Sequence, residues 1–413
     1  MKIKKVISLM LVIILCITYS SCQRKKKDDK SGTDKNLNVY IDIKDKNSLN
    51  IIKFLTEEYK NENQKVQLKI NDVLGGNGNI VEDVSKGTQA DLIFTSRNTM
   101  MELSQKGLIS DLGQYFEKNK IGEKYYDVIP AYGRIGEKYY GIAVMPYTME
   151  IYYNIEALKK LGITQPANIK DMVSVIKKLS AQNVRIPVVI PEDLDINTAV
   201  SAIAASNTLK LSELDNIYDN KNEYVKMKQM QGVFEIINSA VKQLGVNKNS
   251  FEIGNESTFT SLISGSIPVA LGTSYNYSNV KESKTINVVE DYTVLNSQKG
   301  VTPVIVNTLI CMPSNGKNSE ESGKFIKFVL DEKTQEKLVK KGFISGNKKS
   351  NEKLSGMGKS IEKHLSQSND NSIIYVYSLP KKFQGVISAK IDSILSGNYT
   401  GSEWEKSVEE VYK

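Results

Sequence analysis

Residues 138–154 read KYYGIAVMPYTMEIYYN and hold two short runs of residues that favour β-strands. Pro146 separates the run 139–144 from the run 149–153. Because proline cannot donate a hydrogen bond to a sheet, one uninterrupted central strand is disfavoured. The pattern predicts a strand, a break, and a second strand that leads into a helix starting near Ile155. Two arrangements fit these residues: either the chain crosses from one lobe to another at the break, or the two strands are neighbours in one sheet.

The first 21 residues have the pattern of a secretion signal rather than of a folded segment. Three lysines in residues 1–5 precede the apolar run 7–17, which is shorter than the ~20 residues that a membrane-spanning helix needs. The sequence TYSSC follows and resembles a lipobox, in which the signal is cut before Cys22 and this cysteine receives a diacylglyceryl anchor. Tyr19 stands where leucine is usual, so an ordinary secretory signal cut near Ser21 is the alternative. Both readings place the protein outside the cytoplasm, and the first anchors it to the cell membrane.

Residues 23–36, QRKKKDDKSGTDKN, contain no apolar side chain. Such a segment cannot bury enough surface to offset its ordering entropy, so residues 22–36 are predicted to be a disordered tether that begins at the lipidated cysteine. The signal and the tether together carry most of the formal charge of +8, which leaves the folded body at about +2. A body this close to neutrality gives no reason to expect nucleic-acid binding.

Cysteine and histidine are scarce, which limits the chemistry that the folded body can perform. Cys311 lies in an apolar run and is predicted to be a buried small hydrophobe. The only histidine, His364, lies on a polar helical stretch and is predicted to be a surface residue. No disulfide framework or zinc spacing is present, and Ser-His-Asp or Cys-His catalysis has little to work with. We therefore expect no enzyme activity, no metal site and no cofactor.

The rest of the chain alternates strand-like and helix-like segments. Strands are expected at 37–43, 66–70 and 91–95, with a helix capped by Ser48 after the first of them. This alternation argues for an α/β lobe with a largely parallel sheet. About 375 residues remain for folding, which exceeds what one hydrophobic core usually serves, so we expect two lobes.

The second half of the chain is richer in predicted helices. Asn168 can cap a helix, residues 192–265 are expected to be mainly helical, and a strand is expected at 267–272. The long β run 301–311 offers a return crossing to the first lobe. The glycine-rich segment 75–78 lacks the spacing of a nucleotide-binding fingerprint and is predicted to be a flexible loop.

The order of these segments resembles the extracellular solute-binding proteins of ABC importers, the large family 1 that includes maltodextrin- and other sugar-binding proteins. The resemblance covers nearly the whole body. Each motif is short, but their order and spacing together are specific. The matching segments are ADLIF (90–94) with GLI (107–109), YGIAV (140–144) with YYN (152–154), VALG (269–272), and FIKF (325–328) with QEKL (335–338).

The resemblance implies a type II periplasmic-binding-protein-like α/β fold, with two lobes, a hinge and a ligand cleft between the lobes. Closure is then a hinge motion, and the closed form docks on a membrane permease. The break at Pro146 becomes a crossing between lobes. The approximate boundaries place residues 37–142 and 296–332 in lobe I, and residues 143–295 and 333–413 in lobe II.

Ligands of α/β sheets bind at the carboxyl ends of the strands, and this rule, together with the resemblance, selects the candidate site. Sugar-binding relatives often place tryptophan after the strand that ends here at Gly272, whereas this chain has Tyr275 and Tyr277 there and its only tryptophan, Trp404, near its end. Tyrosine also offers an apolar face and a polar tip. The alternative for each candidate is a solvated or structural polar group. The candidate ligand-binding residues are Asp42, Asp45, Ser96, Arg97, Asn98, Tyr147, Glu150, Tyr275, Tyr277 and Asn307.

The expected function is that of a monomeric, lipid-anchored solute-binding protein that captures a sugar or oligosaccharide and delivers it to an ABC transporter permease. Two alternatives stay open. The same fold can bind a non-sugar solute, such as a polyamine, a sugar phosphate or a peptide-like compound. An extracellular enzyme or a structural lipoprotein is the third possibility, but no activated nucleophile or paired acid and base has convincing context.

Overall fold

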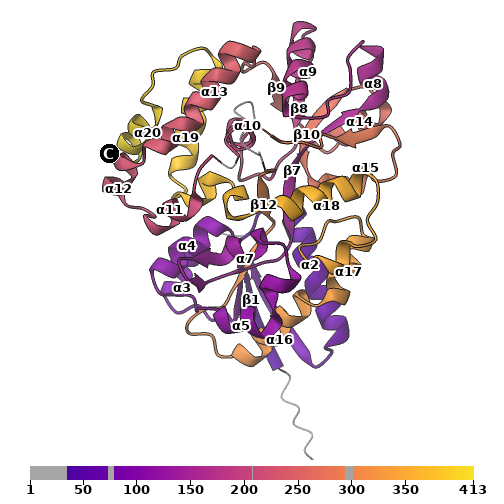
Figure 1. Ribbon diagram of the computed structural model, residues 1–413. Coiled ribbons are helices and arrows are strands. Elements are labelled where there is room, and N and C mark those ends of the chain that lie inside the picture. The colour runs from indigo at the N-terminus through magenta and orange to yellow at the C-terminus, as the bar shows by residue number, and fades with distance from the viewer. Residues whose placement is uncertain (1–34, 73–78, 207, 294–300) are drawn as a thin grey trace, which may run out of the picture.

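The computed structural model describes residues 35–72, 79–206, 208–293 and 301–413, and it consists of two β-sheets, each flanked by helices (Figure 1). The predicted signal, most of the predicted tether and the glycine-rich segment 75–78 lie outside the described residues. The prediction that the disordered tether extends to residue 36 is wrong at its end, because Lys35 and Asn36 pair with Val66 and Gln67 in the first sheet. In Figure 1 the first sheet occupies the lower part of the molecule and the second sheet the upper part. We call each sheet with its helices a lobe. No helix in the described ranges is long and apolar enough to cross a membrane.

The first sheet has the strand order β2-β1-β3-β13-β6. Its first three strands are parallel, as the alternation of strands and helices predicts, and β13 runs antiparallel to both β3 and β6. The strands are β1 (Lys35–Ile41), β2 (Val66–Asp72), β3 (Leu92–Thr95), β6 (Ile142–Ala143) and β13 (Leu309–Cys311).

The helices that accompany this sheet also come from both ends of the chain. Helix α16 contacts β1 and α2, and α7 contacts β6. Asp45, and not Ser48, caps α2: its carboxylate accepts a hydrogen bond from the Ser48 backbone amide at 2.7 Å. The helices are α2 (Lys46–Glu62), α3 (Ile80–Ser85), α4 (Arg97–Gln105), α5 (Gly113–Asn119), α6 (Ile121–Lys124), α7 (Val128–Gly133), α16 (Ser319–Val329) and α17 (Glu332–Lys340).

The second sheet is built around β7, a fully buried strand. Strand β7 pairs antiparallel with β10, β11 and β12, and β8 lies between β10 and β9 with parallel pairing on both sides. The strands are β7 (Pro146–Asn154), β8 (Ile186–Val188), β9 (Phe251–Ile253), β10 (Val269–Thr273), β11 (Ile286–Val288) and β12 (Val304–Val306), while β4 (Arg134–Ile135) and β5 (Lys138–Tyr139) form a small separate ladder.

Residues 192–265 are mainly helical, as predicted, and a 3₁₀ turn, η2 (Lys228–Met230), separates α12 from α13. Asn168 caps α9 as predicted. The helices are α8 (Ile155–Lys160), α9 (Ile169–Ala181), α10 (Ile196–Ala204), α11 (Leu211–Asn216), α12 (Lys221–Lys226), α13 (Gln231–Leu244), α14 (Thr258–Ser264), α15 (Tyr277–Val280), α18 (Met357–Gln367), α19 (Phe383–Leu395) and α20 (Glu403–Val411), with the 3₁₀ helices η3 (Ser274–Asn276), η4 (Lys349–Asn351), η5 (Asp370–Ser372) and η6 (Tyr375–Ser378).

The chain crosses between the sheets twice, and both crossings were predicted. Strand β6 belongs to the first sheet and β7 to the second, so the chain changes lobes just before Pro146. It returns between β12 and β13. The two crossing segments are hydrogen-bonded to each other, because the Asn307 backbone amide donates to the Met145 carbonyl at 3.0 Å and the Met145 amide donates to Asn307 Oδ1 at 2.9 Å.

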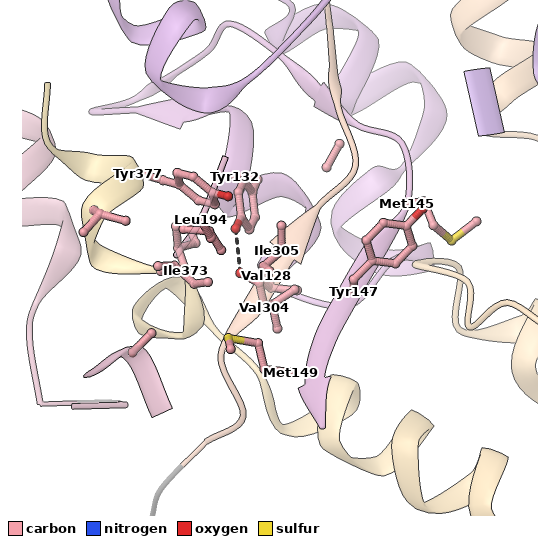
Figure 2. Packing of buried hydrophobic residues seen from close by; sticks show 14 of the residues in the cluster. Val128, Tyr132, Met145, Tyr147, Met149, Leu194, Val304, Ile305, Ile373 and Tyr377 are labelled. Atoms are coloured by element: carbon pink, nitrogen blue, oxygen red, sulfur yellow. Dashed lines mark hydrogen bonds between the residues drawn. The ribbon is translucent and has the colours of Figure 1, made fainter. Parts of the chain in front are cut away.

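Buried side chains fill the junction beside these crossings. Figure 2 shows Tyr132 of α7 directed at β12, where its hydroxyl donates to the Val304 carbonyl at 2.6 Å. Burial raises the pKa of Tyr132, so the hydroxyl keeps its proton for this bond. Ile373 of the C-terminal segment forms an isolated bridge with Val304, which brings a third stretch of chain to the same junction.

The C-terminal third of the chain contributes to both lobes. Lys337 of α17 pairs with Glu58 and Glu62 of α2 at 2.6 and 3.0 Å, so α17 packs with the first sheet although the approximate boundary placed residues 333–413 in lobe II. Helices α19 and α20 pack with α13 (Figure 1). Trp404 is buried there and stacks on Phe383, so the only tryptophan has a structural role. Cys311 is buried, as predicted.

Helix α7 approaches the segment that leads into β6 closely at Gly133, and a substitution there tests this contact. A Cβ atom at this position would lie 1.7 Å from the Gly141 carbonyl oxygen, which is backbone and cannot rotate away. We expect Gly133→Ala to lower the free energy of unfolding by about 1–3 kcal/mol, measured by urea denaturation. Gly122→Ala on α6, where a Cβ meets nothing within 4 Å, is the control and should change it by less than about 0.5 kcal/mol. Equal effects of the two substitutions would contradict the clash.

Candidate functional site

A cleft of about 510 Å³ lies between the two lobes and is lined mainly by polar side chains. The first sheet contributes the loop after β1 and the start of α4 after β3. The second contributes the loop after β8 and strand β12, and the C-terminal segment after η6 adds Lys381 and Gln384. Most of these positions are carboxyl ends of strands, as the strand-end rule predicts. Six of the ten candidate residues line this cleft: Asp42, Asp45, Ser96, Arg97, Asn98 and Asn307.

Asp42 and Asp45 present carboxylates on the side of the first lobe. Asp42 accepts a hydrogen bond from the Thr95 hydroxyl at 2.9 Å. Burial raises the pKa of Asp42, although this bond and the charges of Lys381 and Lys44 pull it back. Asp45 accepts from the backbone amide and the hydroxyl of Ser48, which fixes its position at the start of α2. Both side chains are partly exposed, so they can accept hydrogen bonds from a molecule in the cleft.

Ser96 and its two neighbours follow β3, but their polar atoms are largely engaged. Ser96 caps α4 by accepting a hydrogen bond from the Thr99 amide at 3.3 Å. The side chain of Asn98 is buried and donates to the carbonyl oxygens of Val376 and Leu379. These bonds attach the start of α4 to η6, and they leave these side chains less free to bind a solute than their position after the strand suggested.

Arg97 is a buried cross-link rather than a free cation. Its side chain is 2% exposed and forms a two-pronged ion pair with Asp215 of α11, at 3.0 and 2.8 Å. The same guanidinium donates to the carbonyl oxygens of Tyr132 and Tyr377. Because Asp215 neutralises it, Arg97 offers little positive charge to an anionic solute.

The second lobe contributes an acidic group that the sequence analysis did not select. Asp193 follows β8 and accepts a hydrogen bond from the Tyr377 hydroxyl at 2.8 Å. The protein atoms that crowd the cleft raise the pKa of Asp193, even though its side chain keeps contact with solvent, and the negative charge of Asp45 raises it further. The same strand-end rule that selected Asp42 applies to β8, so Asp193 could have been found. Tyr377 and Lys381 carry no such signal, because tertiary folding alone brings the C-terminal segment here.

Asn307 is the candidate whose surroundings point most directly to a ligand. Its side chain is 6% exposed and lines the cleft. The Met145 amide donates to Oδ1, which fixes the orientation of the amide group, and Nδ2 has no hydrogen-bond partner among the described residues. A buried donor without a partner costs free energy unless something in the cleft accepts from it.

The tyrosine candidates lie beside the cleft rather than in its lining. Tyr147 is buried on β7, pairs in register with Ile305, and its hydroxyl also has no partner in the described part of the chain. The ring of Tyr275 packs edge-on against that of Tyr147, with centroids 5.6 Å apart. Tyr277 is buried in α15 next to Gly358 of α18. Neither Tyr275 nor Tyr277 presents its ring to this cleft.

Glu150 lies away from the cleft, in a buried ion pair with His364. His364 Nδ1 is 3.0 Å from Glu150 Oε2, and Nε2 is 3.0 Å from the Glu290 carbonyl oxygen. The prediction that His364 lies at the surface is wrong: its side chain is 3% exposed, because α18 turns this face toward β7 and β11. Both neighbours of the ring are acceptors, so both ring nitrogens donate when the imidazole is protonated. Burial alone would lower the pKa of His364, but the Glu150 carboxylate raises it above the ordinary value of 6.5.

The described residues contain no cluster of three or more His, Cys, Asp or Glu side chains that could hold a metal ion. The chemistry that the cleft does offer is recognition, through carboxylate acceptors and amide donors held by other hydrogen bonds.

Comparisons with known proteins agree with this arrangement. A family model described as "Bacterial extracellular solute-binding protein" matches residues 46–336. Among solved structures, a family 1 extracellular solute-binding protein from Bifidobacterium longum subsp. infantis is similar over 92% of this chain and 99% of that chain, with TM-score 0.68 and 15% identity. The sugar-binding protein MalE from Xanthomonas citri is similar over 91% and 96%, with TM-score 0.66 and 11% identity. The maltose-binding protein MalE from Listeria monocytogenes, in complex with maltose, is similar over 92% and 97%, with TM-score 0.59 and 16% identity. No curated protein sequence matches the chain.

The buried ion pair of His364 and Glu150 predicts that the free energy of unfolding depends on pH, and it predicts the direction of that dependence. Because the pKa of His364 is raised in the folded state, the pair contributes its full stability below pH 6.5, and this contribution is lost as the pH rises through the folded-state pKa. We expect His364→Gln to lower the free energy of unfolding by about 3–5 kcal/mol at low pH, since it leaves the Glu150 carboxylate buried without its partner, and to remove this pH dependence.

Urea denaturation across about pH 5.5–8.5 measures the effect, and His364 is the only histidine in the chain, so no other imidazole contributes. Gln367→Ala, an exposed and uncharged change on the same helix, is the control and should keep the pH dependence. Parallel pH profiles of wild type and His364→Gln would contradict the assignment.

Proposed function

The chain belongs to the family of bacterial extracellular solute-binding proteins, and from this we propose that it captures a sugar or oligosaccharide between its lobes and delivers it to an ABC transporter permease. The observation that supports this most is the polar cleft between the two sheets, which presents carboxylate acceptors and the buried donor Nδ2 of Asn307. The permease, in this proposal, recognises the closed form.

Hydroxyl-rich solutes suit the groups in the cleft. A sugar hydroxyl donates to a carboxylate such as that of Asp42 or Asp45, and its oxygen accepts from Asn307 Nδ2. Tyr147 is the register partner of the lining residue Ile305. We propose that its free hydroxyl forms a further hydrogen bond with the solute when the lobes move. Solved structures with the same fold support this proposal, since one holds maltose and another is a chitin oligosaccharide binding protein.

Aromatic stacking contributes less here than in a cleft with exposed tryptophan. Trp404 is buried in the C-terminal helices, and the tyrosines that reach the cleft, Tyr132 and Tyr377, are almost fully buried. Binding then depends on hydrogen bonds and electrostatics more than on ring faces. For this reason a non-sugar polar solute stays the second candidate.

Capture in this proposal is a hinge motion about the two crossing segments. The hydrogen bonds between Met145 and Asn307 keep these segments together while the lobes rotate. The fold and family are those of substrate-binding proteins, and we propose that the chain itself performs no catalysis. The N-terminal lipid on Cys22 would keep the protein at the membrane surface, near the permease.

A thermal-unfolding screen of the purified protein against sugars, polyamines, amino acids and phosphorylated sugars tests the proposal. A ligand at about a hundred times its dissociation constant stabilises by ~2.7 kcal/mol, which shifts the midpoint by several degrees at roughly 2–4 °C per kcal/mol. We expect a shift with one sugar class. The affinity for that sugar should fall about fivefold in Tyr147→Phe, which removes one neutral hydrogen bond.

Tyr59→Phe is the matched control, because the Tyr59 hydroxyl is also buried without a partner in the described residues but lies in the core of the first lobe, against Phe325. It should bind the sugar as the wild type does. A shift only with a charged solute would favour the second candidate, and unchanged affinity in Tyr147→Phe would remove that residue from the site.

The lipid anchor has its own test. Metabolic labelling with a radioactive fatty acid should label the wild-type protein in the membrane fraction, and Cys22→Ser should abolish the label because the acceptor thiol is gone. Cys16→Ser is the control and should stay labelled, since Cys16 follows Leu15 and not a small residue. If the signal is instead cut as an ordinary secretory signal near Ser21, the wild type itself will be unlabelled and released.

A further inference from the structure

We propose that the solute bears a positively charged amino group beside its hydroxyl groups, as an amino sugar does, and that Asp42, Asp45 and Asp193 receive this group. The inference rests on the solute-binding function proposed above and narrows the class of solute. Three observations support it: the excess of negative charge in the cleft, the carboxylate oxygens that lack hydrogen bonds, and the buried donor Nδ2 of Asn307.

The cleft carries an excess of negative charge. Among the described residues that line it, five bear carboxylates and three bear cations. One of these cations, Arg97, is already neutralised by Asp215. One of the carboxylates, Glu102, is paired with Lys106 at 2.9 Å, which leaves four carboxylates and two cations. The remaining cations, Lys44 and Lys381, have exposed side chains and form no ion pair within 4.0 Å in the described part of the chain. A neutral sugar would leave this excess charge uncompensated.

The three aspartates converge from opposite lobes, and two of them, Asp45 and Asp193, are only partly satisfied. The end of β1 supplies Asp42 and Asp45, and the loop after β8 supplies Asp193. In Asp45 and Asp193 one oxygen accepts from Ser48 or Tyr377, and the other has no hydrogen bond to another described residue. The charge of Asp45 raises the pKa of Asp193, which means that the two carboxylates repel each other across the cleft.

Closing the cleft makes this repulsion more costly, because water that screens the carboxylates is expelled. An ammonium group placed among them offsets the cost and forms charge-assisted hydrogen bonds, which are stronger than those from a neutral hydroxyl. Lys381 lines the same cleft, and its charge opposes the burial that raises the pKa values of Asp42 and Asp193. Its exposed side chain is free to move aside for an ammonium group on the solute.

Asn307 shows that charge alone is not sufficient. Its buried Nδ2 lines the same cleft without a partner, and a donor needs an acceptor that an ammonium group does not supply. A hydroxyl or ring oxygen does supply one. A simple polyamine therefore satisfies the carboxylates but not Asn307, a neutral sugar satisfies Asn307 but not the charge, and an amino sugar satisfies both.

Three series of short β-1,4-linked oligomers test the inference, because they differ only in the group on carbon 2. These are glucosamine oligomers with an ammonium group, glucose oligomers with a hydroxyl, and N-acetylglucosamine oligomers with a neutral amide. We expect calorimetric titration of the purified protein to give about tenfold or tighter binding of the ammonium series. Raising the salt concentration should reduce this advantage.

Asp193→Asn should reduce the advantage of the ammonium series by about tenfold, since the amide removes the charge but keeps an oxygen that accepts from Tyr377. Asp392→Asn, an exposed carboxylate on α19 outside the cleft lining, is the control and should leave it unchanged. The ligand-free midpoint of each variant confirms that it folds.

The two proposals fail in different ways. Binding of a neutral series at equal or higher affinity overturns the amino-sugar inference and leaves the solute-binding function standing. Absence of binding by the ammonium series also overturns the inference, whatever the other series do, and the wider thermal screen then decides the solute-binding function separately. An advantage of the ammonium series that Asp193→Asn does not change would overturn the role assigned to the aspartates.

Discussion

The pairing of the two crossing segments is the constraint on which the rest of the structure depends. Met145 and Asn307 exchange hydrogen bonds at the point where both segments pass from one sheet to the other, and Pro146–Thr148 then continue the pairing with Val304–Val306. Because these bonds fix the relative register of the segments, they also fix which strand ends of the first sheet face which loops of the second. The cleft lies beside this junction, where strand ends of the first sheet face the loop after β8, and a few polar cross-links between the lobes lie next to it.

Those cross-links explain why several polar residues near the cleft are not free to bind a solute. Arg97 joins α4 to α11 and η6, and Asn98 adds two further bonds to the same C-terminal turn. A buried guanidinium needs partners for its charge and its donors, and here the protein supplies them itself. The polar atoms that stay available to a solute are those without such a partner, namely the second carboxylate oxygens of Asp45 and Asp193 and Nδ2 of Asn307. Position at a strand end brings a residue to the cleft, but hydrogen bonding decides whether it is available.

The pair formed by Glu150 and His364 illustrates the same distinction in the second lobe. A carboxylate in the middle of β7 has no access to water, so it is tolerated only because His364 of α18 and the Tyr292 hydroxyl contact it. The pair ties a helix from residues 357–367 to the central strand of the sheet. This tie is structural, and it makes the stability of the lobe sensitive to pH without involving the cleft.

The local features of the fold followed from the sequence. Alternation and capping residues located β1 to β3 and α9, because periodicity and backbone chemistry are short-range properties. The proline-interrupted run 138–154 left two arrangements open, and it was the resemblance to a known family that favoured the crossing. The strand-end rule likewise selected Asp42 and Asp45, which line the cleft, whereas Asn307 was selected from its place in the returning β run 301–311. The sequence could not show that Arg97 would be neutralised by Asp215, that His364 would be buried against Glu150, or that Lys381 and Tyr377 would reach the cleft from the end of the chain. Each of these depends on a contact between residues more than a hundred positions apart, and only the packing of the lobes decides which of many polar side chains meet.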